Sequence, residues 1–306
     1  MIEPSVIQPA LREFCVSDGY RIRYRHWAPS AQASECRGIV IAMHGIQSHS
    51  GWYVYSSRRM AEAGFSVYFA DRRGSGLNGA QRGHAAHALR LINDVRTLGQ
   101  LARAECTEAS GRQLPVILLG ISWGGKTAAA AAAMYPEEFD RLALLYPGLE
   151  PRIRPTLWQR LQLNFARDFE ILKRHIPIPL EAPSLFTADP AWQQFIANDP
   201  LALHTVTSSF LNAGRELDRI AATHAAKIHQ PTLLMLAGDD AVIDNAQVRQ
   251  RVNSFGSSHV TTLTYPGARH TLEFEPGREE IFDDLTEWLQ YVAERAWRFG
   301  PEGRLF

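Results

Sequence analysis

The sequence predicts an α/β protein built on a mostly parallel, doubly wound sheet, and three observations support this. Short apolar runs, typical of strands covered on both faces, recur along the first half of the chain. Segments with apolar residues at helical spacing lie between them. The alternation breaks off after Pro147 and returns near residue 231. Repeated strand–helix units of this kind favour a parallel sheet with helices on both faces.

The expected elements follow one another in a regular order. The run at residues 20–25 alternates between apolar and polar side chains, which favours an edge strand. The other strands are predicted at residues 38–43, 65–70, 114–119, 142–146, 231–236 and 260–265. Helices are predicted at residues 58–63, 89–104, 128–133, 245–253 and 281–297.

The break in the pattern predicts an insertion. We expect residues 1–148 and 227–306 to form the core, and residues 149–226 to form a mostly helical insertion. The inserted segment is punctuated by prolines and has no clear buried strand. Between Trp158 and Leu172, apolar residues recur at helical spacing. This apolar face is expected to pack over a site on the core, and transient docking on a membrane surface is the alternative.

Composition excludes several classes of protein. The 306 residues are 45% hydrophobic, and 32 basic residues balance 32 acidic ones, so nothing favours nucleic acid or an anionic membrane as a partner. The three cysteines are scattered and show no metal-type pairing. With no signal-like N-terminus and no apolar run approaching about 18 residues, we expect a cytoplasmic protein without a transmembrane segment.

One motif points to catalysis. Residues 120–124 read GISWG, a G-x-S-x-G pattern between a predicted strand and a predicted helix. This context places the hydroxyl of Ser122 on a tight turn above a parallel sheet. A serine hydroxyl is a weak nucleophile at neutral pH, so it needs a base within hydrogen-bond reach and a carboxylate that orients the base.

Later loops supply both groups at the same edge of the sheet. The strand near residue 236 leads into a loop with three acids, Asp239, Asp240 and Asp244, and the strand ending at residue 265 leads to His270. We predict His270 as the general base and Asp240 as the orienting acid. Asp239 and Asp244 remain alternatives for the acid, and one of them is a candidate cap for the helix that starts near Asn245.

Ester or amide cleavage also needs backbone donors for the developing oxyanion. The residue after the nucleophile, Trp123, supplies one amide. The second is expected from Ile46, because the loop after the strand at residues 38–43 reads His44-Gly45-Ile46 and Gly45 permits a sharp turn.

Together these motifs resemble the serine hydrolases of the monoacylglycerol lipase and lysophospholipase family. The residues that carry the resemblance are 44–53 (HGIQSHSGWY), 71–76 (DRRGSG), 120–125 (GISWGG), 238–244 (GDDAVID) and 267–270 (GARH). The resemblance implies an α/β-hydrolase fold with a helical cap, a Ser122–His270–Asp240 triad, and oxyanion donors at Ile46 and Trp123. The sequence departs from the family pattern at Ile121 and Trp123, where histidine and methionine are usual.

The function expected from these residues is hydrolysis of a small, lipid-derived or similar apolar acyl ester, with no cofactor and no metal. The alternative is an aminopeptidase or amidase of the proline iminopeptidase type, which also carries tryptophan after the serine. Such enzymes have a Gly-Gly-Pro-Gly run after the oxyanion histidine, whereas this chain has Ile46-Gln47-Ser48. An aminopeptidase also needs a carboxylate to hold the substrate's amino group, for which the candidates are Glu150, Glu170, Glu181 and Glu216.

Three further features have structural interpretations. The turn at residues 71–76 is expected to be held by Asp71, which would accept backbone hydrogen bonds. His84 and His87 are expected to contact the surface or the cap and not a metal. Trp52 and Tyr53 either line the pocket or fill the core.

Overall fold

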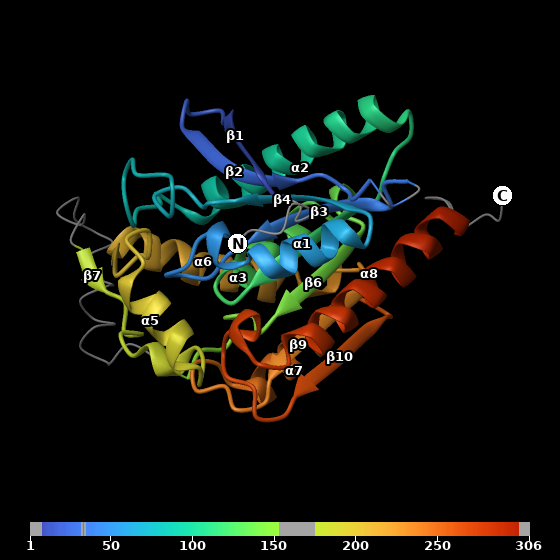
Figure 1. Ribbon diagram of the computed structural model, residues 1–306. Coiled ribbons are helices and arrows are strands. Elements are labelled where there is room, and N and C mark those ends of the chain that lie inside the picture. Colours follow the sequence, from blue (N-terminus) through green and yellow to red (C-terminus); the bar gives the residue numbers. More distant parts are fainter. Residues whose placement is uncertain (1–7, 32, 34, 153–174, 300–306) are drawn as a thin grey trace.

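The computed structural model describes residues 8–31, 33, 35–152 and 175–299. An eight-stranded sheet crosses the molecule, in the order β1-β2-β4-β3-β5-β6-β9-β10 (Figure 1). The two outermost N-terminal strands run antiparallel to their neighbours, and every other pairing is parallel. The strands are β1 (Ala10–Cys15), β2 (Arg21–Trp27), β3 (Gly38–Met43), β4 (Phe65–Ala70), β5 (Val116–Ile121), β6 (Arg141–Leu145), β9 (Thr232–Ala237) and β10 (Val260–Tyr265).

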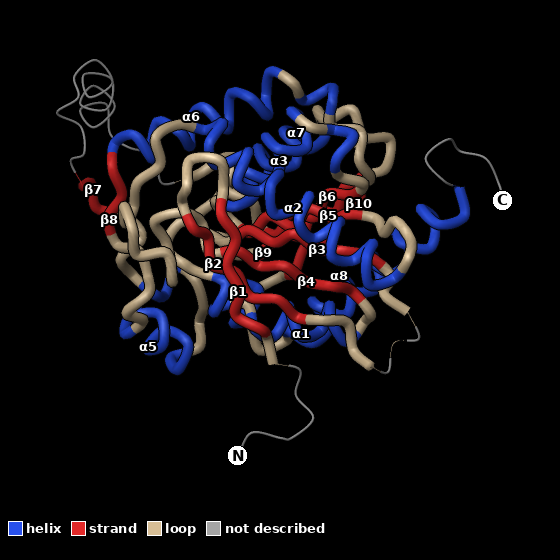
Figure 2. Tube along the Cα trace, turned by 90° about the horizontal axis from the view of Figure 1, so that it is seen from above, coloured by secondary structure: helices blue, strands red, loops and turns tan. Residues whose placement is uncertain are grey.

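Helices cover both faces of this sheet. Figure 2 shows α2 and α3 on one side and α1 and α8 on the other. The core helices are α1 (Val54–Glu62), α2 (Ala88–Ser110), α3 (Gly124–Met134), α7 (Asn245–Asn253) and α8 (Arg278–Phe299). The predicted fold class, a mostly parallel doubly wound α/β sheet, is confirmed.

The sheet centre is the core of the molecule. Every residue of β3, β5 and β9 is buried, so these strands show continuous apolar runs and no alternation. The carboxyl ends of these strands meet at one edge of the sheet, where ligands of open α/β sheets bind.

Residues 149–152 and 175–226 are the described part of the segment predicted as an insertion, and we call them the insertion below. They contain two α-helices, a 3-10 helix and a short strand pair. Helix α5 (Pro190–Asn198) and helix α6 (Ser208–Thr223) are joined by β8 (Thr205–Thr207), which pairs with β7 (His175–Pro177). Helix α6 packs on α3, directly behind the serine turn. The predicted apolar face from Trp158 to Leu172 lies outside the described residues.

One strand prediction was wrong. The segment predicted at residues 20–25 as an edge strand is β2, and β1 lies outside it and forms the edge. Strand β1 escaped notice because five of its six residues are exposed, so it has no apolar alternation. Among the described residues, no helix has the length and apolar character needed to cross a membrane.

Candidate active site

Ser122 occupies a strained turn between β5 and α3. Its φ of +50° lies in the left-handed region, which non-glycine residues rarely adopt. Two glycines make the turn possible: a Cβ on Gly120 would lie 2.7 Å from the Cβ of Ala128, and one on Gly124 would lie 2.3 Å from the carbonyl oxygen of Met43. Close packing of strand, turn and helix therefore lifts the Ser122 hydroxyl above the sheet edge.

The structure brings Ser122, His270 and Asp240 into one hydrogen-bonded series. Ser122 Oγ lies 2.8 Å from His270 Nε2, and His270 Nδ1 lies 2.8 Å from Asp240 Oδ2. The second carboxylate oxygen, Oδ1, accepts the backbone N–H groups of Val242 and Ile243. A carboxylate at Nδ1 favours the tautomer with its proton there, so Nε2 is left to accept the serine proton.

The other two acids have different roles. Asp244 caps α7, accepting the backbone N–H groups of Ala246 and Gln247, and Asp239 is exposed. The side chains of Asp240 and His270 are almost completely buried. Of the three acids, it is thus Asp240 that contacts the imidazole.

Two backbone N–H groups flank the serine. A Cβ added to Gly45 would lie 3.7 Å from Ser122 Oγ, so the turn that carries the Ile46 amide passes directly beside the hydroxyl. Across the described chain, neither the Ile46 nor the Trp123 amide donates to a protein acceptor. Both donors are therefore available to an oxygen bound next to Ser122.

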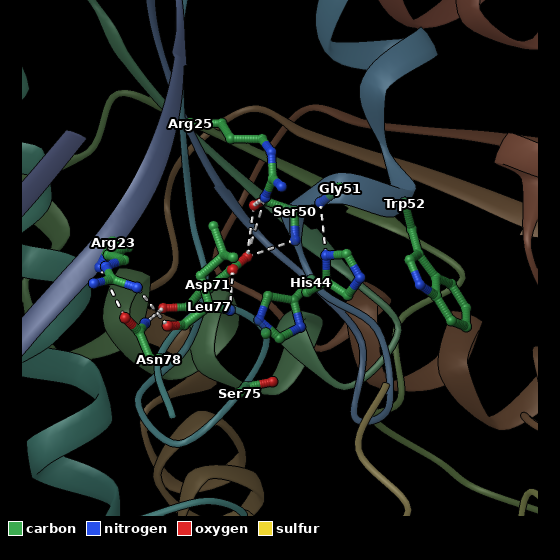
Figure 3. A network of polar contacts seen from close by, with 12 residues as sticks. Arg23, Arg25, His44, Ser50, Gly51, Trp52, Asp71, Ser75, Leu77 and Asn78 are labelled. Atoms are coloured by element: carbon green, nitrogen blue, oxygen red, sulfur yellow. Dashed lines mark hydrogen bonds and ion pairs between the residues drawn. The ribbon is translucent and has the colours of Figure 1, made fainter. Parts of the chain in front are cut away.

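A buried carboxylate joins the segment after β3 to the loop after β4. Figure 3 shows Asp71 between Ser50 and Leu77. Its Oδ1 accepts the Ser50 backbone N–H at 2.7 Å, and its Oδ2 accepts the Leu77 N–H at 2.8 Å. Arg25 approaches the same carboxylate at 3.9 Å. The expectation that Asp71 holds this turn through backbone hydrogen bonds is confirmed.

Aromatic side chains surround the histidine on the insertion side. The Phe186 ring lies 6.0 Å from the His270 ring, and Trp52 packs edge-on against Phe186. Tyr53 stacks on Phe69 in the core. The two aromatics left open by the sequence therefore differ: Tyr53 fills the core, whereas Trp52 joins the core to the insertion.

Polar contacts connect the insertion to the segment after β3. Asp199 Oδ2 accepts hydrogen bonds from His49 Nε2 at 2.9 Å and from Trp52 Nε1 at 2.5 Å. His84 Nδ1 lies within hydrogen-bond distance of the Thr207 and Ser209 hydroxyls, so it contacts the insertion. No cluster of three or more metal-ligating side chains occurs in the described ranges.

Two buried groups, Glu273 and Tyr146, were not predicted from the sequence. The carboxyl of Glu273 is fully enclosed, and burial raises its pKa to about 7. Tyr146 packs against the His270 ring from the end of β6. A glutamate three residues after a histidine is an ordinary surface pattern, so no local signal marked it.

The candidate anchors for a substrate amino group are engaged elsewhere or exposed. Glu150 accepts two hydrogen bonds from Arg251, and Glu216 accepts the backbone N–H of Ala88. Glu181 is exposed, and Glu170 lies outside the described residues.

This fold and a serine turn at its sheet edge define a serine hydrolase with an α/β-hydrolase fold. The chain belongs to the family described as serine aminopeptidase, S33 (Hydrolase_4), which matches residues 34–277. A monoacylglycerol lipase of Mycolicibacterium smegmatis is 29% identical over 274 residues, covering 89% of this chain and 93% of the relative. The human monoglyceride lipase is 22% identical, covering 93% and 92%.

Solved structures agree on the fold. A soluble variant of the monoglyceride lipase of Saccharomyces cerevisiae, in complex with a substrate analog, superposes with a TM-score of 0.80 at 19% identity, covering 95% of this chain and 99% of that one. The monoacylglycerol lipase of Paleococcus ferrophilus superposes with a TM-score of 0.77 at 21% identity, covering 88% and 98%. The relatives' names place this chain among serine hydrolases of the carboxylesterase type.

Proposed function

We propose that this protein hydrolyses carboxylic esters with a single apolar acyl chain, such as monoacylglycerols or lysolipids, through an acyl-enzyme on Ser122. The observation that carries the proposal is the hydrogen-bonded series from Ser122 through His270 to Asp240. The amides of Ile46 and Trp123 beside the serine add to it.

In this mechanism, Ser122 Oγ attacks the ester carbonyl while His270 Nε2 takes its proton. Asp240 holds the tautomer and stabilises the imidazolium that forms. The amides of Ile46 and Trp123 bind the negative oxygen of the tetrahedral intermediate. The imidazolium then protonates the leaving alcohol, the C–O bond breaks, and water repeats the cycle on the acyl-enzyme.

The surroundings of the site favour an apolar substrate. Phe186 lies over His270, and Trp123 stacks on Phe210 of α6 with ring centroids 4.7 Å apart. We assign residues 149–226 the role of a cap over the core, because Phe186 and Phe210 both come from this segment. An aromatic wall matches an acyl chain better than a charged peptide terminus.

The aminopeptidase alternative is less well supported. The described candidates for an amino-group anchor are either exposed or hydrogen-bonded to core groups, as Glu150 is to Arg251. The relatives described above are named lipases, although the family description refers to an aminopeptidase.

A substrate panel tests the proposal. Purified wild type and Ser122→Ala are assayed with monoacylglycerols, p-nitrophenyl esters of several chain lengths, and aminoacyl-naphthylamides. We expect wild type to cleave the esters, Ser122→Ala to be inactive, and the naphthylamides to remain intact. Equal ester rates in the two proteins would overturn the proposal, and cleavage of naphthylamides alone would favour the aminopeptidase.

A further inference from the structure

The loop after β4 sends one arginine beneath the oxyanion turn. Arg72 Nη1 donates to the carbonyl oxygen of Gly45 at 3.1 Å, and Nη2 donates to that of Ile46 at 3.0 Å. The backbone N–H of Arg72 donates to His44 Nε2 at 2.9 Å. One residue therefore contacts three successive residues of the turn.

These contacts determine the direction of the Ile46 amide. The Gly45 carbonyl lies within hydrogen-bond distance of Arg72 Nη1 and also of His44 Nδ1, 2.8 Å away. In a planar trans peptide the C=O and N–H groups point in opposite directions. Holding the Gly45 oxygen on the arginine side therefore turns the Ile46 N–H to the opposite side.

The turn needs such an external restraint. Gly45 has no Cβ and accepts many backbone conformations, so the Gly45–Ile46 peptide has little preference of its own. A Cβ at position 45 would lie 3.1 Å from Ser48 Oγ and 3.4 Å from Ser122 Cβ, so a side chain there would crowd the Ser48 hydroxyl. Glycine provides the space beside the serine, and contacts from outside the turn provide the orientation.

The same guanidinium also lies against the residue that supplies the second amide. Its central carbon is 4.7 Å from the Trp123 ring centroid and 4.9 Å from the Phe210 ring centroid. A planar guanidinium can stack on a ring while its N–H groups donate in its own plane. Arg72 thus connects the two sides of the candidate oxyanion hole.

The charge of Arg72 is not neutralised by a direct partner. Within the described ranges, no carboxylate forms an ion pair with its guanidinium, since neighbouring Asp71 is turned toward Ser50 and Leu77. Burial lowers the pKa of Arg72 to about 9, so the group remains protonated at neutral pH. A fixed positive charge behind the Gly45–Ile46 peptide favours negative charge in front of it.

We propose that Arg72 is a positioning residue of the oxyanion hole, which orients the Ile46 amide toward Ser122 and adds positive charge behind it. This inference rests on the proposed ester hydrolysis at Ser122. It predicts that Arg72 contributes to the transition state more than to ground-state binding of the substrate.

The test compares Arg72→Lys and Arg72→Met with wild type on a short p-nitrophenyl ester. For Arg72→Met we expect kcat to fall about 100-fold while KM changes by less than about threefold, the size of effect typical of an impaired oxyanion donor. Arg72→Lys keeps the charge but loses the planar fork, so an intermediate loss of about 10-fold is expected. Arg96→Met is the control, because Arg96 also stacks on a ring, that of Tyr135, and pairs with Glu138.

A second readout separates positioning from general damage. A trifluoromethyl ketone forms a hemiketal whose oxyanion occupies the hole, whereas the matching trifluoromethyl carbinol is neutral and places no anion there. We expect the affinity for the ketone to fall in parallel with kcat/KM across the variants, and the affinity for the carbinol to stay within about threefold. Thermal unfolding of each variant checks that it is folded. If Arg72→Met does not fold, the kinetics of Arg72→Lys test the proposal.

The outcomes distinguish the two proposals. A wild-type kcat in folded Arg72 variants would overturn the role of Arg72 while leaving Ser122 chemistry intact. Equal losses in affinity for the ketone and for the carbinol would do the same. A wild-type protein that cleaves no ester and takes up no ketone would overturn both.

Discussion

The Tyr146 ring packs edge-on against the His270 imidazole, with ring centroids 5.0 Å apart and planes at 70°. Tyr146 follows β6 directly and has a φ of +37°, an unusual conformation for a bulky side chain. The strained backbone directs the ring under the histidine, which suggests that the ring helps to keep the imidazole aligned between Ser122 and Asp240.

Substitutions at Tyr146 can separate the ring from the hydroxyl. Tyr146→Phe keeps the ring, so kcat should stay within about threefold of wild type. Tyr146→Ala leaves a cavity beside His270, and we expect a loss of roughly 3–5 kcal/mol in the free energy of unfolding and at least a 10-fold fall in kcat. Steady-state kinetics measure kcat, and denaturant titration measures the free energy of unfolding. Full activity in a folded Tyr146→Ala protein would refute the role of the ring.

Glu273 should make stability depend on pH. Burial raises its pKa from 4.5 to about 7, so the folded state binds a proton more tightly than the unfolded state does. The contribution of protonated Glu273 to the stability of the folded state is therefore fully present below about pH 4.5, and it is lost as the pH rises through about 7. At pH 8 the ionised carboxylate should cost roughly 3 kcal/mol relative to low pH.

The isosteric variant tests this directly. Glu273→Gln cannot ionise, so it should gain stability relative to wild type as the pH rises from 5 to 8. Urea unfolding at several pH values measures the difference, with the exposed Glu279→Gln as the control. A difference that does not change with pH would contradict the prediction.

The contact of Asp199 with His49 and Trp52 should govern how the insertion sits on the core. Asp199→Ala removes the acceptor of both hydrogen bonds and leaves the buried His49 and Trp52 donors without a partner. We expect KM to rise several-fold with a smaller change in kcat, and stability to fall by about 1–3 kcal/mol. Because these bonds lower the pKa of Asp199 to about 2, their stabilisation should be lost only as the pH falls from about 4 toward 2. Unchanged KM and stability would show that the contact is dispensable.

The indole of Trp123 should limit the length of the acyl group. An apolar cavity of about 40 Å³ touches Trp123, and its lining includes Leu91, Val95 and Leu98 but not Ser122. Trp123→Met should connect this cavity to the site. We expect the acyl-chain length that gives the highest kcat/KM to increase by two or more carbons, because each buried methylene contributes about 0.8 kcal/mol. A panel of p-nitrophenyl esters measures the optimum. An unchanged optimum would place the acyl chain elsewhere.

Much of the fold was predictable because local signals agreed with tertiary structure. The predicted bounds of β3, β4, α7 and β10 coincide with the observed ones. Continuous apolar runs mark the buried strands, and the Asp244 cap marks the start of α7. Strand β1 was missed because its side chains are mostly exposed, so it carries no apolar pattern.

Part of the candidate site could likewise be predicted from the sequence, and part could not. Ser122, Asp240 and His270 could be predicted, because each follows a recognisable strand and their order along the chain is informative. Other contacts could not be predicted, because they join loops that are distant in sequence and meet only in the folded chain. They are the contacts of Arg72, Tyr146 and Glu273. Asp240 was the acid predicted from the sequence, and its contact with His270 Nδ1 is seen only in the folded chain.

The central claim is that Ser122 is the nucleophile, and covalent labelling tests it most directly. Wild type, Ser122→Ala and His270→Ala are treated with an alkyl fluorophosphonate, and intact mass and peptide mapping locate the adduct. We predict one phosphonyl group on Ser122 in wild type, none in Ser122→Ala, and labelling slowed by at least about 100-fold in His270→Ala. An adduct of equal yield in Ser122→Ala, or one mapped to another residue, would contradict the account.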